Sequence, residues 1–469
     1  MRGNALAAYR RRAARALADA TLRGNLRRAT DTALAKRAAR LAEIPDYDDW
    51  REKVAAIRRA GWEDRAALVA RASAHLAAAG ARVHHAADAA AARRIVAEIA
   101  ADAGARLVVK GKSMLTEEIE LTPHLEALGL EVLETDLGEF IVQLRGEMPS
   151  HITAPALHLN RRQVSRLFAD RLGAAETEDP EELTLAARRH LRDKFLAADV
   201  GISGGNFVVA ETGTLVTLEN EGNIGLSTTL PRVHVALTGI EKCLPRLADL
   251  DPVLRLLPPN GTGQQAVSYV SLLNGPAPPG CGPEALHVVF VDNGRSALAA
   301  SGQREILACL RCGACLNVCP VFRNAGGHSY GAVYPGPMGI LLAPYLLGDA
   351  TAGLNPGNSL ADVCSLCEAC GEVCPAAIPL PDLILGARAE KERRAPASRR
   401  LAWRLFGRLA ASPRLFRAAG AMMRMSLRVL PAFLLARLTP SWSRARALPA
   451  PPPRSFRAEL RRRHPGRLS

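Results

Sequence analysis

The sequence contains two cysteine runs of identical spacing, CLRCGACLNVCP at residues 309–320 and CSLCEACGEVCP at residues 364–375. In each run three thiols recur at every third residue, and a fourth follows after a longer gap and precedes a proline. The first three thiols can converge on one metal–sulfur centre, whereas the longer gap and the proline turn the fourth thiol away from it. Because the pattern occurs twice, each fourth thiol can reach the centre of the other run.

We predict that the two runs hold two 4Fe-4S clusters, because this is the spacing of bacterial two-cluster ferredoxins. The expected ligands are Cys309, Cys312, Cys315 and Cys374 for cluster 1, and Cys364, Cys367, Cys370 and Cys319 for cluster 2. Zinc is disfavoured, since it needs four ligands and is usually bound by separated pairs, so a third cysteine at the same spacing would be superfluous. Disulfides need an oxidising compartment, and the start MRGNALAAYRRR lacks the apolar core of a signal peptide.

Length and composition indicate a folded chain of two or three domains. The chain has 469 residues, of which 48% are hydrophobic, enough for real cores. It contains no run of about 18 predominantly apolar, uncharged residues, so we expect no membrane-spanning helix. The two remaining cysteines, Cys243 and Cys281, are isolated and are interpreted as ordinary reduced thiols.

The net charge of +15 is concentrated at the two ends of the chain. Residues 381–469 carry 21 Arg and Lys against 4 Asp and Glu, and residues 1–40 carry 11 against 2. This asymmetry predicts that the ends meet something acidic, such as a partner subunit, the protein's own acidic middle or a membrane surface. Nucleic acid is not expected, because aromatic residues are only 4% of the chain and no base-reading motif accompanies the arginines.

Helical and alternating patterns divide the remaining sequence. Residues 5–42 predict one long basic helix, residues 46–50 a break, and the stretch to about Ala79 further helix that Gly80 ends. A βαβαβ pattern then predicts a parallel sheet with helices on its faces, within an α/β domain of roughly 220 residues. The expected strands are residues 82–85, 107–109, 130–133, 214–218, 233–237 and 286–291. Helices are expected after Asp88, over residues 116–128 and after Asp179.

Several polar or glycine-rich positions at the expected strand ends are candidates for ligand binding. Lys110, Lys112 and Ser113 lie where a strand gives way to a helix, which favours either an anion site or a solvated turn, and the Walker A glycine is absent. Gly201, Gly204 and Gly205 are interpreted as a tight turn rather than a ligand loop. Glu211 and Thr212 follow this glycine-rich stretch and precede an apolar strand. Four further polar groups near strand ends show no acid–base spacing: Asp136, Glu139, His151 and His158.

The segment between the cysteine runs and the C-terminal tail carry further expectations. Residues 320–363, with Gly326, Gly327 and His328, predict a long loop that covers the clusters or meets a partner. In the tail, arginines and leucines recur every four residues from Arg400 to Leu409, which predicts an amphipathic helix docked on a partner subunit, with anionic lipid as the alternative. Ala450 to Pro453 predicts a Pro-rich arm that ends the packed region.

Five segments together resemble the lactate utilisation protein B (LutB) family. They are KGKSMLTEEIEL (110–121), ETDLGEFIVQL (134–144), PSHITAPALH (149–158), AETGTLVTLENEGN (210–223) and CLRCGACLNVCPVFR (309–323). The resemblance implies an N-terminal helical region (1–80), an α/β LUD domain similar to the sugar-isomerase and CoA-transferase fold (81–298), an α-helical ferredoxin-like domain (299–390) and a basic helical extension (391–469).

The resemblance also implies a function. It is that of an iron-sulfur electron-transfer subunit that works with two sister subunits, one Cys-rich and one LUD-only, in oxidising L-lactate to pyruvate. It implies a cytoplasmic location, with peripheral contact to the inner face of the membrane as a possibility, and supplies no lactate-binding residue. Two alternatives remain open: a stand-alone isomerase or CoA-transferring enzyme that uses the α/β domain, and an iron-sulfur regulator whose basic ends bind DNA.

Overall fold

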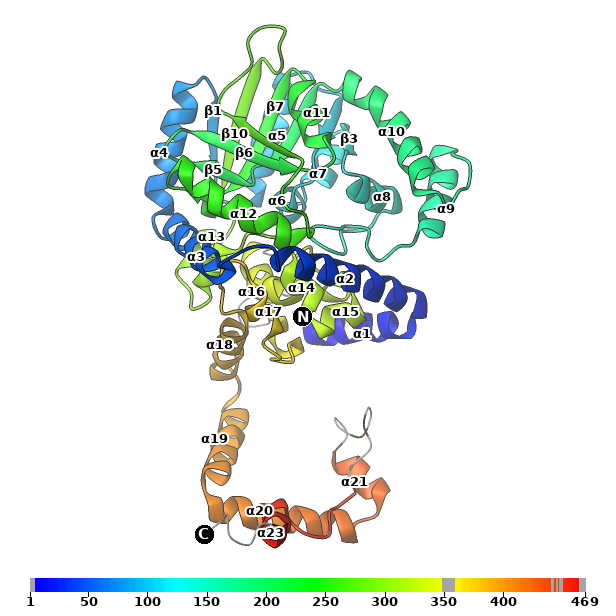
Figure 1. Ribbon diagram of the computed structural model, residues 1–469, viewed down its shortest axis with the longest axis vertical. Helices are drawn as coiled ribbons and strands as arrows, with labels where there is room; N and C mark the ends of the chain where they lie inside the picture. The colour runs from blue at the N-terminus through cyan, green and yellow to red at the C-terminus, as the bar shows by residue number, and fades with distance from the viewer. Residues whose placement is uncertain (1–4, 348–358, 440–442, 444–445, 447–449, 464–469) are drawn as a thin grey trace. The chain divides into compact units, whose positions relative to one another are not determined.

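The computed structural model describes residues 5–347, 359–439, 443, 446 and 450–463. By its internal contacts the chain divides into a large unit, residues 1–391, and a small unit, residues 392–469. Figure 1 shows the large unit as an α/β body together with a helical part that carries the cysteine runs. No helix among the described residues is long and apolar enough to cross a bilayer.

Four helices precede the sheet: α1 (Ala5–Ala18), α2 (Ala20–Leu41), α3 (Tyr47–Glu63) and α4 (Arg65–Ala78). The prediction of one helix over residues 5–42 is wrong, because Asp19 adopts an extended conformation and its side chain accepts a hydrogen bond from the backbone N–H of Leu22. Asp19 is therefore the N-cap of a new helix. The break over residues 46–50 is shorter than predicted, since α3 already begins at Tyr47.

A six-stranded parallel sheet forms the centre of the α/β body, which confirms the predicted α/β class with a parallel sheet. The strand order is β1-β10-β7-β4-β2-β3, and every neighbouring pair is parallel. The strands are β1 (Arg82–Ala86), β2 (Leu107–Lys110), β3 (Glu131–Glu134), β4 (Val200–Gly204), β7 (Val233–Gly239) and β10 (Ala285–Val291). Five of the six lie at predicted strands. The sixth, β4, contains Gly201 and Gly204, so the predicted tight turn is wrong at these two residues.

Both faces of this sheet are covered. Alternate residues of one strand enter different cores, as Val288 and Val289 of β10 do, which is the two-residue period of a strand. One face packs against α5 (Ala89–Asp102), α6 (Met114–Glu118) and α7 (Leu121–Ala127). The other packs against α4 and a second sheet, while the β2–β3 edge packs against α8 (Leu137–Arg145), α9 (Arg161–Leu172) and α10 (Pro180–Ala197).

The second sheet has four strands in the order β8-β5-β6-β9. They are β5 (Phe207–Val209), β6 (Thr214–Glu219), β8 (Cys243–Leu244) and β9 (Tyr269–Leu273). Strand β6 pairs antiparallel with β5 and β9, and β5 pairs parallel with β8. The predicted strand over residues 214–218 therefore exists but belongs to this sheet. Helices α11 (Asn223–Thr229), α12 (Leu250–Gly261) and α13 (Arg295–Ala299) complete the body.

The cysteine-bearing part is built from short helical turns. These are η3 (Arg304–Ala308), α14 (Ala314–Val318), α15 (Pro320–Ala325), η4 (Gly327–Tyr330), α16 (Gly336–Leu346), η6 (Leu360–Val363), α17 (Ala369–Glu372) and α18 (Leu380–Arg393). The predicted long loop between the cysteine runs is wrong over its described residues, because α16 is apolar around nearly its whole circumference and is buried in the largest core. Residues 348–358 of that loop lie outside the described residues.

The described part of the small unit contains four helices. They are α19 (Ala397–Ala411), α20 (Pro413–Val429), α21 (Ala432–Leu438) and α23 (Phe456–Arg463). Of these, α19, α20 and α23 bury no side chain. The amphipathic helix predicted around Arg400–Leu409 is α19. The Pro-rich arm at Ala450–Pro453 has no helix or strand, as predicted, but it does not end the folded chain because α23 follows it.

Candidate functional site

The two cysteine runs adopt the same local conformation. The residue two places after the first cysteine has a left-handed backbone in both runs, with φ of 61° at Arg311 and 54° at Leu366. Its backbone N–H donates to the thiol of that cysteine at 3.3 Å, on Cys309 in the first run and Cys364 in the second. Non-glycine residues adopt such angles only where the surroundings enforce them. The repeated conformation therefore wraps each chain segment around its thiols.

The structure brings the eight thiols of the two runs into two neighbouring groups. Burial, together with the nearby thiols of Cys309 and Cys374, raises the pKa of Cys312 to about 12. Burial likewise raises the pKa of Cys370 to about 12, and there the acting neighbours are Cys364, Cys319 and Cys367. The fourth cysteine of each run thus lies with the first three of the other. A metal bound at either group has to displace the thiol protons.

Basic side chains of the N-terminal helices hold the backbone of the cysteine-bearing part. Arg51 of α3 donates to the carbonyl oxygens of Cys374 and Gly371, both at 2.7 Å. Arg37 of α2 donates to the carbonyl of Val373 at 3.2 Å, and Arg12 of α1 donates to those of Ser329 and Tyr330. Arg12, Arg37 and Arg51 therefore fix the cysteine-bearing part through neutral backbone carbonyls, and the predicted acidic partner of the basic N-terminal segment stays a prediction.

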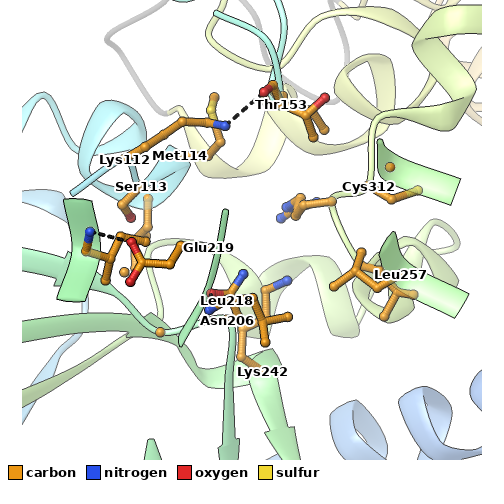
Figure 2. A pocket seen from close by; sticks show the side chains of 18 of the residues that line it. Lys112, Ser113, Met114, Thr153, Asn206, Leu218, Glu219, Lys242, Leu257 and Cys312 are labelled. Carbon is orange, nitrogen blue, oxygen red and sulfur yellow. Dashed lines mark hydrogen bonds between the residues drawn. The ribbon is translucent and has the colours of Figure 1, made fainter. Parts of the chain in front are cut away.

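A cavity of about 270 Å³ lies between the sheet and the first cysteine run. Its wall on the sheet side comes from the carboxyl ends of the parallel strands, where ligands of open α/β sheets bind: Lys112 and Ser113 after β2, Asp136 after β3, Gly205 after β4, and Lys242 after β7. The opposite wall includes Leu310, Arg311 and Cys312. Figure 2 shows Lys112, Lys242 and Cys312 around this space, which therefore reaches a predicted ligand of cluster 1.

A buried ionic network borders the cavity through Glu241, Arg295 and Tyr334. Arg295 makes a bidentate contact to Glu118, at 2.8 and 3.0 Å, and donates to Glu241 at 2.5 Å. Tyr334 donates its hydroxyl to Glu118 at 2.7 Å. Although burial opposes ionisation of Glu241, the nearby cations Arg295, Lys242 and Arg311 lower the pKa of its carboxyl to about 2. The carboxylate of Glu241 is therefore ionised. Both oxygens of Glu118 and Oε2 of Glu241 are engaged, whereas Oε1 of Glu241 has no hydrogen-bond partner among the described residues.

Three further cations line the cavity with weaker engagements. Lys112 donates to the backbone carbonyl of Thr153 at 3.2 Å, which Figure 2 shows as a dashed line. Lys242 donates to the carbonyl of Cys309 at 3.4 Å. Arg311 lies 5.0 Å from the centre of the Tyr334 ring and 3.6 Å from Glu241, and its Nη1 has no hydrogen-bond partner among the described residues.

The predicted candidates divide between the cavity and the core. Lys112 and Ser113 lie on the cavity wall, whereas Lys110 is fully buried and bonds to Glu134 at 2.8 Å, the residue directly beside it on β3. The carboxylates of Glu134 and Glu117 outweigh the burial of Lys110 and raise the pKa of its ammonium. Lys110 is thus part of the scaffold. Glu211 accepts a hydrogen bond from Leu247 N and Thr212 bonds to Thr214, both away from the cavity.

The other polar candidates have separate surroundings. Asp136 caps α8 by accepting from the backbone N–H of Glu139, which is itself buried. His151 lies against the first cysteine run and accepts from the backbone of Thr153 and Ala154, and burial lowers its pKa to about 3. His158 instead joins Glu147 and His328 in a group whose ligand atoms lie within 4.8 Å of one another.

Sequence reasoning missed Lys242 and the side-chain position of Arg311. The signal for Lys242 was its place three residues after strand β7, the same rule that pointed to Lys112. Arg311 stands between cluster ligands in the sequence, as Asn317 and Glu368 do, and its backbone N–H does reach a thiol. Its guanidinium instead faces Tyr334 and the cavity.

Comparison with known families assigns three regions of the chain. A LUD domain model matches residues 69–291, a 4Fe-4S dicluster domain model matches residues 305–378, and a model described as lactate utilisation protein B, C-terminal, matches residues 386–464. The dicluster match and the Cys-rich region at 309–374 fit two 4Fe-4S clusters, as predicted. The chain is therefore an iron-sulfur protein that joins a LUD domain to a dicluster domain.

Full-length relatives identify the family. A protein from Bacillus cytotoxicus named lactate utilization protein B is 40% identical over 450 residues, covering 94% of this chain and 93% of that protein. One of the same name from Lysinibacillus sphaericus is 39% identical over 468 residues, covering 98% and 97%. This chain belongs to the lactate utilisation protein B family. A solved DUF162 family protein from Deinococcus radiodurans, 14% identical, covers 48% of this chain and 98% of its own with a TM-score of 0.29, too low to inform the fold.

Proposed function

We propose that this chain is the electron-transfer subunit of a multi-subunit system that oxidises L-lactate to pyruvate. The observation that carries the proposal is the grouping of eight thiols into two adjacent sets of four, in a chain of the lactate utilisation family. The proposed ligands are those predicted from the cysteine spacing: Cys309, Cys312, Cys315 and Cys374 for one cluster, and Cys364, Cys367, Cys370 and Cys319 for the other.

The electron balance suits two clusters. When L-lactate becomes pyruvate, its C2–H and O–H bonds break, a C=O bond forms, and two protons and two electrons leave. A 4Fe-4S cluster takes one electron at a time, so the pair can accept both electrons of one substrate molecule. The protein's contribution is to hold the clusters side by side and to set their potentials through burial and through the N–H groups that donate to the thiols.

The proposal extends to domains, partners and location. In it, residues 81–298 form a LUD domain of sugar-isomerase and CoA-transferase type, residues 299–390 a ferredoxin-like domain, and residues 1–80 and 391–469 helical regions. The partners are a Cys-rich sister subunit and a LUD-only sister subunit in the cytoplasm. The small unit docks on a sister subunit, since α19 and α20 expose large apolar side chains such as Phe406 and Phe416, and contact with the membrane surface is the alternative.

The test uses the complete chain purified without oxygen. We expect about eight irons per chain and a broad absorption near about 400 nm that dithionite bleaches. L-lactate should bleach the same absorption when the sister subunits are present, and D-lactate should serve as the negative control. If dithionite bleaches the clusters of the assembled complex but L-lactate does not, the proposed function is wrong.

A further inference from the structure

We infer that the cavity beside the first cysteine run is a binding site for a small monocarboxylate that carries an oxygen atom on C2. Arg311, Lys242 and Lys112 would bind the carboxylate from the wall of this cavity. The binding of an anion follows from the cavity alone, whereas the choice of a 2-hydroxy or 2-oxo acid rests on the proposed function. The inference assigns a ligand site to this chain and leaves open where the C2–H bond is broken.

The size of the cavity favours a molecule of few heavy atoms. Its volume of about 270 Å³ lies just below the roughly 300–1,000 Å³ that is typical of sites for drug-sized ligands. A three-carbon acid with its hydration fits this volume. The walls also combine apolar side chains, such as Leu218 and Leu257, with a few polar groups, the composition expected of a small-molecule site.

Most carboxylate oxygens on the wall already have partners. Glu241 is paired through Oε2 with Arg295 at 2.5 Å, and its Oε1, which accepts no hydrogen bond among the described residues, lies 3.6 Å from the Arg311 guanidinium. Glu219 accepts hydrogen bonds from the backbone N–H groups of Ile224 and Gly225 at 2.6 and 2.7 Å, and Asp136 caps α8. Glu221, the fourth, is exposed and accepts from the N–H of Asn220. These partners offset much of the repulsion that the carboxylates would exert on an entering anion.

The cations, in contrast, have donor capacity to spare. The Arg311 side chain is only 13% exposed, and among the described residues its buried Nη1 finds no acceptor. An unpaired buried donor costs free energy, so an acceptor that enters the cavity and bonds to it would be stabilised. A guanidinium fork also matches a carboxylate in geometry, and the ammonium group of Lys112 adds charge on the sheet side of the wall. Lys242 can donate a hydrogen bond there, but burial lowers its pKa to about 7, so it does not carry a full charge at neutral pH.

Two polar groups can recognise the C2 oxygen. The Ser113 hydroxyl and the Asn206 amide lie on the sheet side of the cavity in Figure 2. Asn206 accepts from the backbone N–H of Leu218 through its oxygen, which leaves its NH₂ group free to donate. Gly204 keeps this corner open, since a Cβ there would lie 2.6 Å from the Ser113 oxygen.

The competing explanation is that these cations only offset the negative charge of the adjacent cluster. The variants Arg311→Lys and Lys112→Met separate the two roles. Arg311→Lys keeps the charge beside the cluster but removes the planar fork. Lys112→Met removes a charge from the sheet side, where the ammonium contacts Thr153 and no cysteine. The matched control is Lys194→Met, because Lys194 pairs with Glu131 at the amino end of β3, the opposite edge of the sheet.

The test is anaerobic titration calorimetry of the cluster-loaded full chain with oxamate, a stable planar 2-oxo acid analogue, and with propionate, which lacks the C2 oxygen. We expect oxamate to bind about ten-fold or more tightly than propionate, and each site variant to weaken oxamate binding by about ten-fold or more. Lys194→Met should bind like the unmodified chain. Iron content and dithionite bleaching are measured on the same samples. If Arg311→Lys loses iron, the affinity of Lys112→Met for oxamate is used alone to judge the proposed site.

The possible outcomes distinguish the proposed anion site from the proposed electron-transfer function. If the unmodified chain carries its iron and bleaches with dithionite but takes up no oxamate, or if Lys112→Met binds oxamate unchanged, the cavity is not the site and the electron-transfer function still stands. If oxamate binds as expected but L-lactate does not reduce the assembled complex, the proposed function fails and the anion site stands. Equal affinity for oxamate and propionate would overturn the C2 specificity.

Discussion

At the scale of single residues, the sheet depends on one buried lysine. Lys110 has no exposed surface and bonds to Glu134 at 2.8 Å, to Glu117 at 3.2 Å and to Thr116 at 2.8 Å. Removal of the ammonium would leave Glu134 buried without its cation, which typically costs about 3–5 kcal/mol. We therefore expect Lys110→Met to lower the free energy of unfolding by that amount in urea titrations.

The control for this prediction is the double variant Lys110→Met with Glu134→Leu. It removes both charges, so it should recover most of the lost stability, because a buried pair can be exchanged for apolar residues at little cost. If Lys110→Met alone loses less than about 1 kcal/mol, the pair does not hold β2 to β3.

The exchange of ligands between the two cysteine runs is also testable at single residues. In the proposed assignment, Cys319 belongs to cluster 2 although it lies in the first run, and the structure places it near Cys364 and Cys367. We expect Cys319→Ser to reduce the iron content to about half while the cluster held by Cys309, Cys312 and Cys315 remains. Cys281→Ser, at an exposed isolated thiol, should keep all the iron. Full iron retention in Cys319→Ser would contradict the assignment.

At the scale of elements, strand β4 depends on a glycine. A Cβ at Gly201 would lie 1.7 Å from the carbonyl oxygen of Ser227, so α11 packs directly on the backbone of β4. We expect Gly201→Ala to destabilise the protein by about 3 kcal/mol or more, because backbone must move to admit the methyl group. Thermal unfolding followed by circular dichroism would measure this.

A second glycine provides the matched comparison. Gly24 lies inside helix α2, and no atom lies within 4 Å of the place that an alanine methyl group would take there. Gly24→Ala should therefore stabilise the protein by about 0.5–1 kcal/mol through helix propensity alone. If alanine changes the stability equally at both positions, the close contact of α11 with β4 is not the reason that a glycine is required at position 201.

These elements also show what the sequence could predict. The strands rich in β-branched and aliphatic residues, such as Val233–Leu237 and Leu286–Val291, could be placed because their composition is that of a buried parallel strand. Strand β4, VGISG, could not, because its glycines serve close packing by a helix that is distant in sequence. Helix α16 was missed because its glycines and prolines resemble a loop, whereas its burial comes from contacts with other elements.

The candidate site was predictable to a similar extent. The spacing alone grouped the cysteines, and the strand-end rule pointed to Lys112 and Ser113, which line the cavity. Lys110, one residue before this loop, was indistinguishable from them in sequence, since only the register of β2 against β3 shows that it faces Glu134. Arg311 reaches the cavity because the fold brings the first cysteine run over the sheet, which no local pattern encodes.

At the scale of the whole molecule, buried histidines make stability depend on pH. Burial lowers the pKa of His234 to about 3 and that of His287 to about 4, and His234 bonds to Ser203 at 2.7 Å. In the unfolded chain these pKa values return to about 6.5. Between pH 6.5 and about 4 the unfolded state therefore binds more protons, so the stability these groups provide is present above pH 6.5 and is lost as the pH falls.

We expect the midpoint of urea unfolding to decrease steadily from pH 7 to pH 5. His234→Gln should flatten this decrease, since glutamine can bond to Ser203 without titrating. A decrease as steep in His234→Gln as in the unmodified chain would assign the effect to other groups.

The division of the chain into two units predicts separable roles. Residues 392–469 bury no side chain in the helices α19, α20 and α23, and they expose large apolar groups, among them Trp403, Met425 and Phe433. The large unit keeps its own cores and its contacts around the clusters, including the ion pair of Lys391 with Asp362. A chain that ends at Arg394 should therefore keep its iron, and its melting temperature should lie within about 2 °C of that of the full chain. The truncation should change the free energy of unfolding by less than about 0.5 kcal/mol, which corresponds to a shift of this size.

The same truncation tests where the sister subunits bind. If the small unit is the docking surface, the chain ending at Arg394 should no longer co-purify with them, and L-lactate should no longer bleach its clusters although dithionite still does. Substitution of Phe406, Phe416 and Phe433 by serine in the full chain should give the same loss, because the exposed rings supply the apolar area that a stable interface needs. If the truncated chain still binds the sister subunits, the interface lies on the large unit, and contact with the membrane surface becomes the preferred role of the small unit.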